Sequence, residues 1–168
     1  MLCNMFTFEQ VLENKKQIRL TPSQALLKAA NFCAYQERAH HEVIERLSEW
    51  GIWGDDAQEI LLQLIEQNYV NEERFAVAFA GGKFRIKHWG KTKIKLELKQ
   101  KKVSDYCINK ALQAIEEDDY VKMLEQVIDK KWHETKDANL LAKRAKVAKY
   151  AISRGFESDL IWDILKRY

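Results

Sequence analysis

Basic residues crowd one short stretch of this chain, and their chemistry is the first clue to its function. From Lys83 to Lys102 there are nine lysines and arginines against one acidic residue, Glu97. Closely spaced cations attract nucleic-acid phosphates by releasing counterions, without reading the base sequence. The stretch therefore predicts a polyanion-binding surface, and the competing interpretation is a set of solvated helix faces.

A second basic cluster, beginning at Lys143, occupies the matching place in a later repeat of the sequence. Trp89 lies among the cations of the first cluster, where an exposed ring would stack a single-stranded base. We interpret Trp89 instead as an apolar anchor, because small helical units need large core residues. The predicted polyanion-binding side chains are the basic residues Lys83, Arg85, Lys87, Lys91, Lys93, Lys95, Lys99, Lys143, Arg144, Lys146 and Lys149.

Other arrangements that could do chemistry are incomplete. Gly90-Lys91-Thr92 looks like the end of a phosphate-binding P-loop, but the glycine required five residues before the Gly-Lys pair is Arg85. His40-His41-Glu42 lacks the spacing of four that lets two helical histidines hold one metal ion. Nothing in the spacing pairs Cys33 or Cys107 with a base, so both are interpreted as core fillers. We predict no catalytic residue, no metal and no cofactor, and hence no enzyme.

Length and composition restrict the elements that position these cations. The chain has 168 residues, of which 46% are hydrophobic and 32% charged. It contains no apolar stretch of the ~20 residues that a membrane span requires and no signal-like start. Three distant cysteines suit a reducing compartment, so we expect a cytoplasmic protein with no membrane contact. One proline and six glycines leave few strong breakers and favour helices.

An internal repeat organises the expected helices. Ile52, Val103 and Phe156 are equivalent anchors, 51 and 53 residues apart. The residue five positions before each anchor is apolar, and the residues five, eight, nine and twelve positions after it are apolar or aromatic. This shared register predicts three copies of a unit that ends in helix, tight turn, helix.

Each copy has room for one further helix in front, so we predict an all-α fold of three tandem three-helix modules in an elongated, curved array. The first helix signal is the capping box Thr21-Pro22-Ser23-Gln24. The predicted organisation is an N-terminal extension over residues 1–20 and modules over residues 21–70, 71–117 and 118–168. The predicted helices span about 22–37, 41–50, 55–67, 71–87 and 119–132.

One segment carries two signals. Residues 84–88 and 93–98 alternate with period two, which is typical of strands, and could form a basic hairpin around Trp89-Gly90. Ile94 and Leu98 are four residues apart, however, and Leu98 falls at a repeat position that is helical elsewhere. We predict helix here, with Gly81 and Gly82 inside or near the end of one, where they permit close packing or a bend.

In the order of its motifs, the chain from about Ser23 to Tyr168 resembles the bacterial RecX regulators of the RecA recombinase. Asn71-Glu72-Glu73-Arg74-Phe75-Ala76 is similar to the family's Asp-Asp-Glu-Arg-Phe-Ala signature. The segment from Gly90 to Leu98 is similar to its glycine, isoleucine, Glu-Leu pattern, and Arg154-Gly155-Phe156 matches its third unit. Arg38-Ala39 departs from the family, which often has a helix-capping serine at the second position.

The resemblance implies a non-enzymatic regulator that binds the RecA filament on single-stranded DNA and inhibits ATP hydrolysis and strand exchange, modulating recombination, DNA repair and the SOS response. We expect a monomer. We expect weak, salt-dependent contact with single-stranded DNA, and loss of inhibition when Lys91, Lys93 and Lys95 are reversed to Glu. The alternative is a sequence-independent single-stranded nucleic-acid-binding module without recombinase contact. A magnesium-dependent nuclease using the scattered carboxylates has little support.

Overall fold

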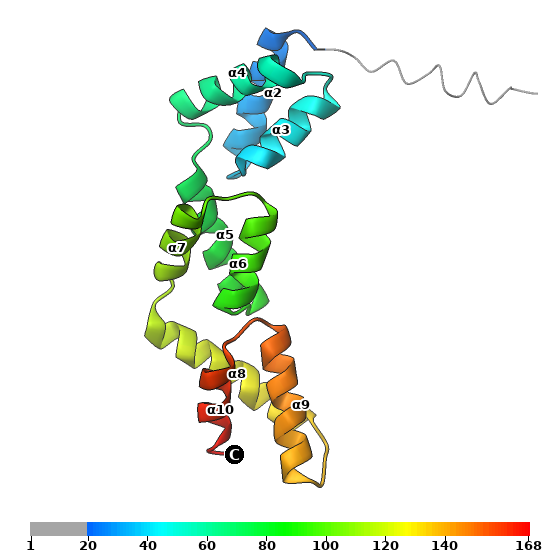
Figure 1. Cartoon of the computed structure of the whole chain (residues 1–168), viewed down its shortest axis with the longest axis vertical. Helices are drawn as coiled ribbons and strands as arrows, with labels where there is room; N and C mark the ends of the chain where they lie inside the picture. Colours follow the sequence, from blue (N-terminus) through cyan, green and yellow to red (C-terminus); the bar gives the residue numbers. More distant parts are fainter. Residues whose placement is uncertain (1–19) are drawn as a thin grey trace, which may run out of the picture. The chain divides into compact units, whose positions relative to one another are not determined.

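The computed structural model describes residues 20–168, which form nine helices and, within that range, no strand (Figure 1). The helices follow one another in three sets of three, which confirms the predicted all-α fold of tandem three-helix modules. All but the last residue of the predicted N-terminal extension, and Cys3 with it, lies outside the described residues.

The first set comprises α2 (Pro22–Tyr35), α3 (His40–Glu49) and α4 (Gly54–Glu66). The second comprises α5 (Glu72–Lys87), α6 (Lys91–Gln100) and α7 (Asp105–Gln113), and the third comprises α8 (Glu117–Glu134), α9 (Leu140–Ser153) and α10 (Ser158–Leu165). The described chain divides into two compact units: residues 20–36 with 42–69, and residues 37–41 with 70–168.

The first unit shows why its opening helix begins where it does. The Thr21 side chain accepts a hydrogen bond from the Gln24 amide, and the Gln24 side chain accepts one from the Thr21 amide. This pair is the predicted capping box, with Pro22 at the first helical position. Small residues such as Ala25 and Ala29 are fully buried on α2, which packs against α4.

The second unit has one continuous apolar core that runs through both of its helix sets. In the second set α5 packs on α6 and α7, and in the third set α8, α9 and α10 pack on one another. Leu98 of α6, Leu124 of α8 and Ile161 of α10 are all completely buried in the same cluster. Because the core is shared, α5 to α10 fold as one body.

The predicted repeat is present in the backbone. The amides of Ile52, Val103 and Phe156 donate to the carbonyls five residues earlier, at 3.0, 3.2 and 3.3 Å. The residue before each anchor has positive φ, at 82°, 58° and 91°. These features define a Schellman turn, which satisfies the last carbonyls of a helix. In the second copy, Lys102 adopts this left-handed conformation in place of the glycine found in the other two.

The ambiguous segment is helical, so the hairpin alternative is wrong. α5 continues to Lys87, and α6 begins directly after Gly90. α5 ends before His88, whose left-handed backbone conformation caps the helix. Gly81 is buried inside α5 beneath the Arg85 guanidinium, which a Cβ at position 81 would overlap. The strand-like alternation instead reflects lysines on both flanks of a helix with a narrow apolar face.

Candidate nucleic-acid and partner-binding surface

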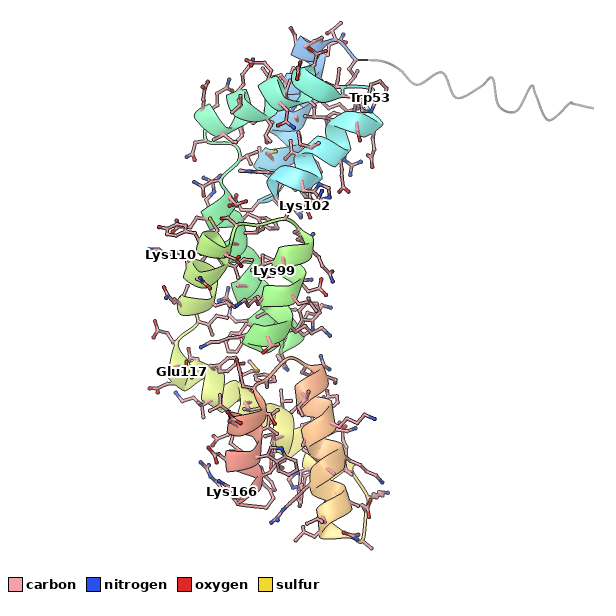
Figure 2. All side chains as sticks on the ribbon, in the orientation of Figure 1. Trp53, Lys99, Lys102, Lys110, Glu117 and Lys166 are labelled. Atoms are coloured by element: carbon pink, nitrogen blue, oxygen red, sulfur yellow. The ribbon has the colours of Figure 1, made fainter. Side chains whose placement is uncertain are left out.

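α6 carries four of the predicted cations on a short amphipathic helix. Ile94 and Leu98, one helical turn apart, are completely buried and fix the helix on α5 and α7. Lys91, Lys95 and Lys99 recur at the same spacing on another face. Figure 2 shows Lys99 on this helix. The other predicted cations lie on α5 and α9, in the same unit.

Lys91, at the first position of α6, contacts the third helix set. Its ammonium donates to Glu117 Oε2 at 2.7 Å and lies 4.5 Å from the centre of the Tyr120 ring. Both partners belong to α8, at whose start Figure 2 shows Glu117. The Lys91 side chain is only 22% exposed. Its charge is therefore directed toward a neighbouring helix of the same protein.

Lys83 and Lys93 are also engaged within the protein. Their ammonium groups lie 4.9 and 4.7 Å from the centre of the Trp89 ring, close enough for cation–π attraction. Trp89 is partly buried against the core, in agreement with the prediction that it is an apolar anchor. Lys93 Nζ also donates to the Ser153 carbonyl at 3.4 Å.

The start of α6, including its cap residue Gly90, is hydrogen-bonded to the third helix set. We call this contact the joint. The amides of Gly90 and Thr92 donate to the carbonyls of Arg154 and Gly155 at 2.9 and 3.1 Å. The amide of Lys91 donates to the Tyr120 hydroxyl at 3.0 Å. A phosphate at this helix start would compete with protein acceptors for these amides. The amides that a phosphate cradle at Gly90-Lys91-Thr92 would use are thus already hydrogen-bonded within the protein.

Tyr120 lies at the centre of this joint. Its hydroxyl accepts from the Lys91 amide and donates to Glu157 Oε2 at 2.5 Å. Burial, together with the hydrogen bond to Glu157, raises the pKa of the Tyr120 phenol well above its ordinary value. The ring packs between Phe84 of α5 and Phe156, the third repeat anchor.

Arg154 completes the joint, although it was not among the predicted binding residues. Its guanidinium donates to the Lys87 carbonyl at 3.0 Å and to the Tyr150 hydroxyl at 2.8 Å. The Arg154-Gly155-Phe156 motif thus binds the last turn of α5. The sequence marked Phe156 as a repeat anchor, but the contact between Arg154 and α5 could not be predicted, since the Lys87 carbonyl lies 67 residues earlier.

Most of the predicted cations on α9 are likewise engaged within the protein or partly buried. Lys143 lies 4.3 Å from the centre of the Trp132 ring, and Lys146 donates to Asp137 Oδ2 at 2.8 Å. The hydrogen bond from Lys146 lowers the pKa of the Asp137 carboxyl. Arg144 is partly buried, and its Nε has no hydrogen-bond partner among the described residues.

A smaller set of predicted cations is exposed to solvent. Within residues 20–168, Arg85, Lys87, Lys95 and Lys149 are exposed and make no ion pair. Lys99 makes one exposed ion pair, with Asp105 at 3.3 Å. We call these five residues the outward cations. They are the predicted binding residues whose charge is most available to another molecule.

The six-residue signature beginning at Asn71 has a structural role. Asn71 caps α5 by accepting the Arg74 amide at 2.8 Å, and the Arg74 guanidinium donates to Glu37. Glu72 accepts from the Ser104 hydroxyl at 2.6 Å. Burial raises the pKa of Glu72, but the hydrogen bonds from Ser104 and Cys107 outweigh burial, so the pKa is lowered.

The departure at Arg38-Ala39 also has a physical explanation. Ala39 is 1% exposed and belongs to the apolar core of the second unit. The alanine methyl is buried in this core and offers no side-chain cap to α3, which begins at the next residue, His40.

The described residues hold no group of three or more side chains arranged to bind a metal ion. Cys33 and Cys107 are buried, as expected of core fillers. Among residues 20–168, no helix has both the length and the apolar character needed to cross a membrane.

Two parts of the chain match known family models. Residues 71–112 match "RecX, second three-helix domain", and residues 117–165 match "RecX, third three-helix domain". A curated relative, "Regulatory protein RecX" of Lactobacillus johnsonii, is 28% identical over 138 residues, covering 82% of this chain and 51% of the relative. The protein of that name from Bacillus cytotoxicus is 26% identical over 138 residues, with the same coverage. The chain spans about half the length of these curated relatives.

Solved structures show the same fold. A crystal structure of RecX from Lactobacillus salivarius is 24% identical, with a TM-score of 0.79 over 87% of this chain and 95% of the other. A second, described as regulatory protein RecX, is 17% identical, with a TM-score of 0.79 over all of this chain and 83% of the other. At these identities the likeness concerns the arrangement of helices.

Proposed function

The chain belongs to the RecX family of regulatory proteins, and we propose on this basis that it binds the RecA filament on single-stranded DNA and inhibits ATP hydrolysis and strand exchange. In this proposal it is a cytoplasmic monomer that acts without catalysis, cofactor or metal. Its effect would be to limit recombination, DNA repair and the SOS response.

The observation that carries the proposal is the set of outward cations. Lys95 and Lys99 lie one turn apart on α6, and Lys149 lies on α9 of the same unit. Their charges are not used in the joint between the two helix sets. A polyanion can therefore bind them without breaking the contacts that hold the second unit together.

The proposed mechanism separates positioning from inhibition. The outward cations would contact the filament, and each contact with a phosphate of its DNA would release counterions and make binding sensitive to salt. The joint would hold α6 and α9 in a fixed relation while they bridge neighbouring parts of the filament. Such a bridge would oppose movement of neighbouring filament subunits relative to one another during hydrolysis and strand exchange.

The test is ATP hydrolysis by a RecA filament on single-stranded DNA, with this protein titrated in. Binding to the naked strand is measured in the same buffer by fluorescence anisotropy. We expect hydrolysis to fall at protein concentrations at least about tenfold below those that coat the naked strand. Undiminished hydrolysis at saturating protein would contradict the proposal.

The alternative, a single-stranded nucleic-acid-binding module without recombinase contact, uses the same exposed lysines. It predicts that inhibition follows coating of the strand, with the two titrations coinciding. Raising the salt concentration would then weaken both to the same extent, because one set of phosphate contacts would account for both.

A further inference from the structure

A groove lies between α6 and the end of α9, on the solvent side of the joint. It has a volume of about 470 Å³, and its lining comes from both helices and from Gly155. Two aliphatic side chains in it are open to solvent: Leu96 is 57% exposed and Ile152 is 48% exposed. Single exposed aliphatic residues are common, but two that line one groove from separate helix sets form a small apolar site.

Among residues 20–168, the charges that line this groove all have one sign: Lys93, Lys95 and Lys99 line it, and no acidic residue of that range does. Lys149 lies one helical turn before Ile152 on α9, so it extends the positive side along the groove. Lys95 makes no ion pair within the described residues, and the partner of Lys99, Asp105, is itself exposed.

Hydrogen bonds of the joint link the two walls of the groove. The Thr92 amide donates to the Gly155 carbonyl at 3.1 Å, and Lys93 Nζ donates to the Ser153 carbonyl at 3.4 Å. All four residues line the groove. Its two walls are therefore connected directly, and a ligand would not have to order them on binding.

We propose that this groove binds an acidic protein segment that inserts an aliphatic side chain between Leu96 and Ile152 and places carboxylates beside the lysines. The proposal deepens the proposed function, on which it rests for the identity of the partner. It assigns Lys95 and Lys99, which line the groove, to carboxylates of the filament protein. The other outward cations, Arg85, Lys87 and Lys149, are assigned to DNA phosphates. The groove combines two exposed aliphatic side chains with lysines around them, and this combination indicates the kind of segment that it binds.

The lining favours a protein segment over a nucleic acid. Sites for single strands stack bases on aromatic rings, and none of the described residues that line this groove is aromatic. Leucine and isoleucine instead gain from burying an aliphatic group, while lysine ammoniums on flexible stems reach carboxylates in many positions. An acidic segment without an apolar side chain would leave the floor exposed.

The test uses a fluorescein-labelled twelve-residue peptide of Asp and Glu with two leucines four positions apart, and binding is measured by anisotropy. We expect the paired change Leu96→Ser and Ile152→Ser to weaken binding at least tenfold. Lys95→Glu with Lys99→Glu should weaken it as much. The control is Leu141→Ser, which removes a 75% exposed leucine from the other end of α9, outside the groove.

Two results would overturn the proposal. One is equal binding of a peptide whose leucines are replaced by serine, which would reduce the interaction to charge alone. The other is an equal loss of affinity for a labelled oligothymidine in the Leu96→Ser, Ile152→Ser protein, which would make the groove a nucleic-acid site. Circular dichroism of each variant establishes that the helices are intact.

The peptide measurement contains no recombinase, so it separates the two proposals. Peptide binding in a protein that leaves RecA hydrolysis unchanged would refute the proposed function and keep the groove. Full inhibition of hydrolysis by the Leu96→Ser, Ile152→Ser protein, which keeps every outward cation but no longer binds the peptide, would refute the groove as a filament contact and keep the proposed function.

Discussion

Lys91 and Lys95 lie one helical turn apart on α6, yet they belong to different regions of the molecule. Lys91 is held by Glu117 and by the Tyr120 ring of α8, in the joint between two helix sets. Lys95 is exposed, lines the groove and makes no ion pair within residues 20–168. A lysine on the same helix thus stabilises the contact between two helix sets in one case and is exposed to solvent in the other.

This difference changes how charge-reversal experiments are interpreted. Reversing Lys91, Lys93 and Lys95 together would disturb the joint and the outward surface at once. Loss of inhibition would then have two explanations. The joint and the groove therefore have to be perturbed by separate substitutions, which should differ in their effect on stability.

The largest effect is expected from Gly155→Ala. Gly155 has φ of +91°, and a Cβ there would overlap Lys93 of α6. Left-handed strain and this overlap should together cost about 3 kcal/mol or more of unfolding free energy, measured by urea denaturation. Gly82→Ala is the control, because a Cβ there meets nothing within 4 Å and alanine should stabilise α5 by about 1 kcal/mol. Equal stability of the two variants would mean that the joint is not closely packed.

Tyr120→Phe should have an intermediate effect. The change keeps the ring but removes the acceptor for the Lys91 amide and the donor to Glu157. We expect a loss of about 1–2 kcal/mol near neutral pH, because a buried amide loses its partner. Retained wild-type stability in urea denaturation at pH 7 would contradict the assigned role of the hydroxyl.

The same variant tests the pKa of Tyr120. Because that pKa is raised in the folded protein, its stabilising contribution is complete below the ordinary tyrosine pKa of about 10 and is lost as pH rises above it. Wild-type stability should therefore fall more steeply above pH 10 than that of Tyr120→Phe. Parallel pH profiles would show that the phenol ionises alike in the folded and unfolded chains.

The smallest effects on stability are expected from single lysine changes. Lys91→Gln removes the ion pair with Glu117 and should cost about 0.5–1 kcal/mol, because Lys91 is mostly covered while Glu117 is exposed. Lys95→Gln should change stability by less than about 0.5 kcal/mol. Thermal denaturation of the two variants, measured in the same buffer, gives the difference. Equal shifts in Tm would contradict the distinction between a lysine in the joint and a lysine exposed to solvent.

Local patterns made much of the fold predictable. The capping box at Thr21 and the anchors Ile52, Val103 and Phe156 depend on residues within one or two turns, so their spacing in sequence specifies their structure. The helix over α6 was predictable because Ile94 and Leu98 match a helical repeat position. The predicted helix bounds were less accurate: α8 begins at Glu117, two residues before its predicted start.

The candidate surface was predictable only as a list of charges. Charge density along the sequence cannot distinguish Lys91 from Lys95, because the partners of Lys91 lie on α8, more than 20 residues away. The role of Arg154 depends on the Lys87 carbonyl, 67 residues earlier. The groove needs Leu96 and Ile152 together, and each alone looks like an ordinary exposed residue.

The most direct test of the account is inhibition of RecA ATP hydrolysis by a variant that changes only outward cations. Lys95→Glu with Lys149→Glu is compared with a matched reversal on other helices, Lys110→Glu with Lys130→Glu; Figure 2 shows Lys110 on α7. We expect the first variant to keep wild-type helix content and lose at least tenfold in inhibitory potency, while the second inhibits as the wild type does. Equal inhibition by both variants would contradict the claim that the outward cations contact the filament.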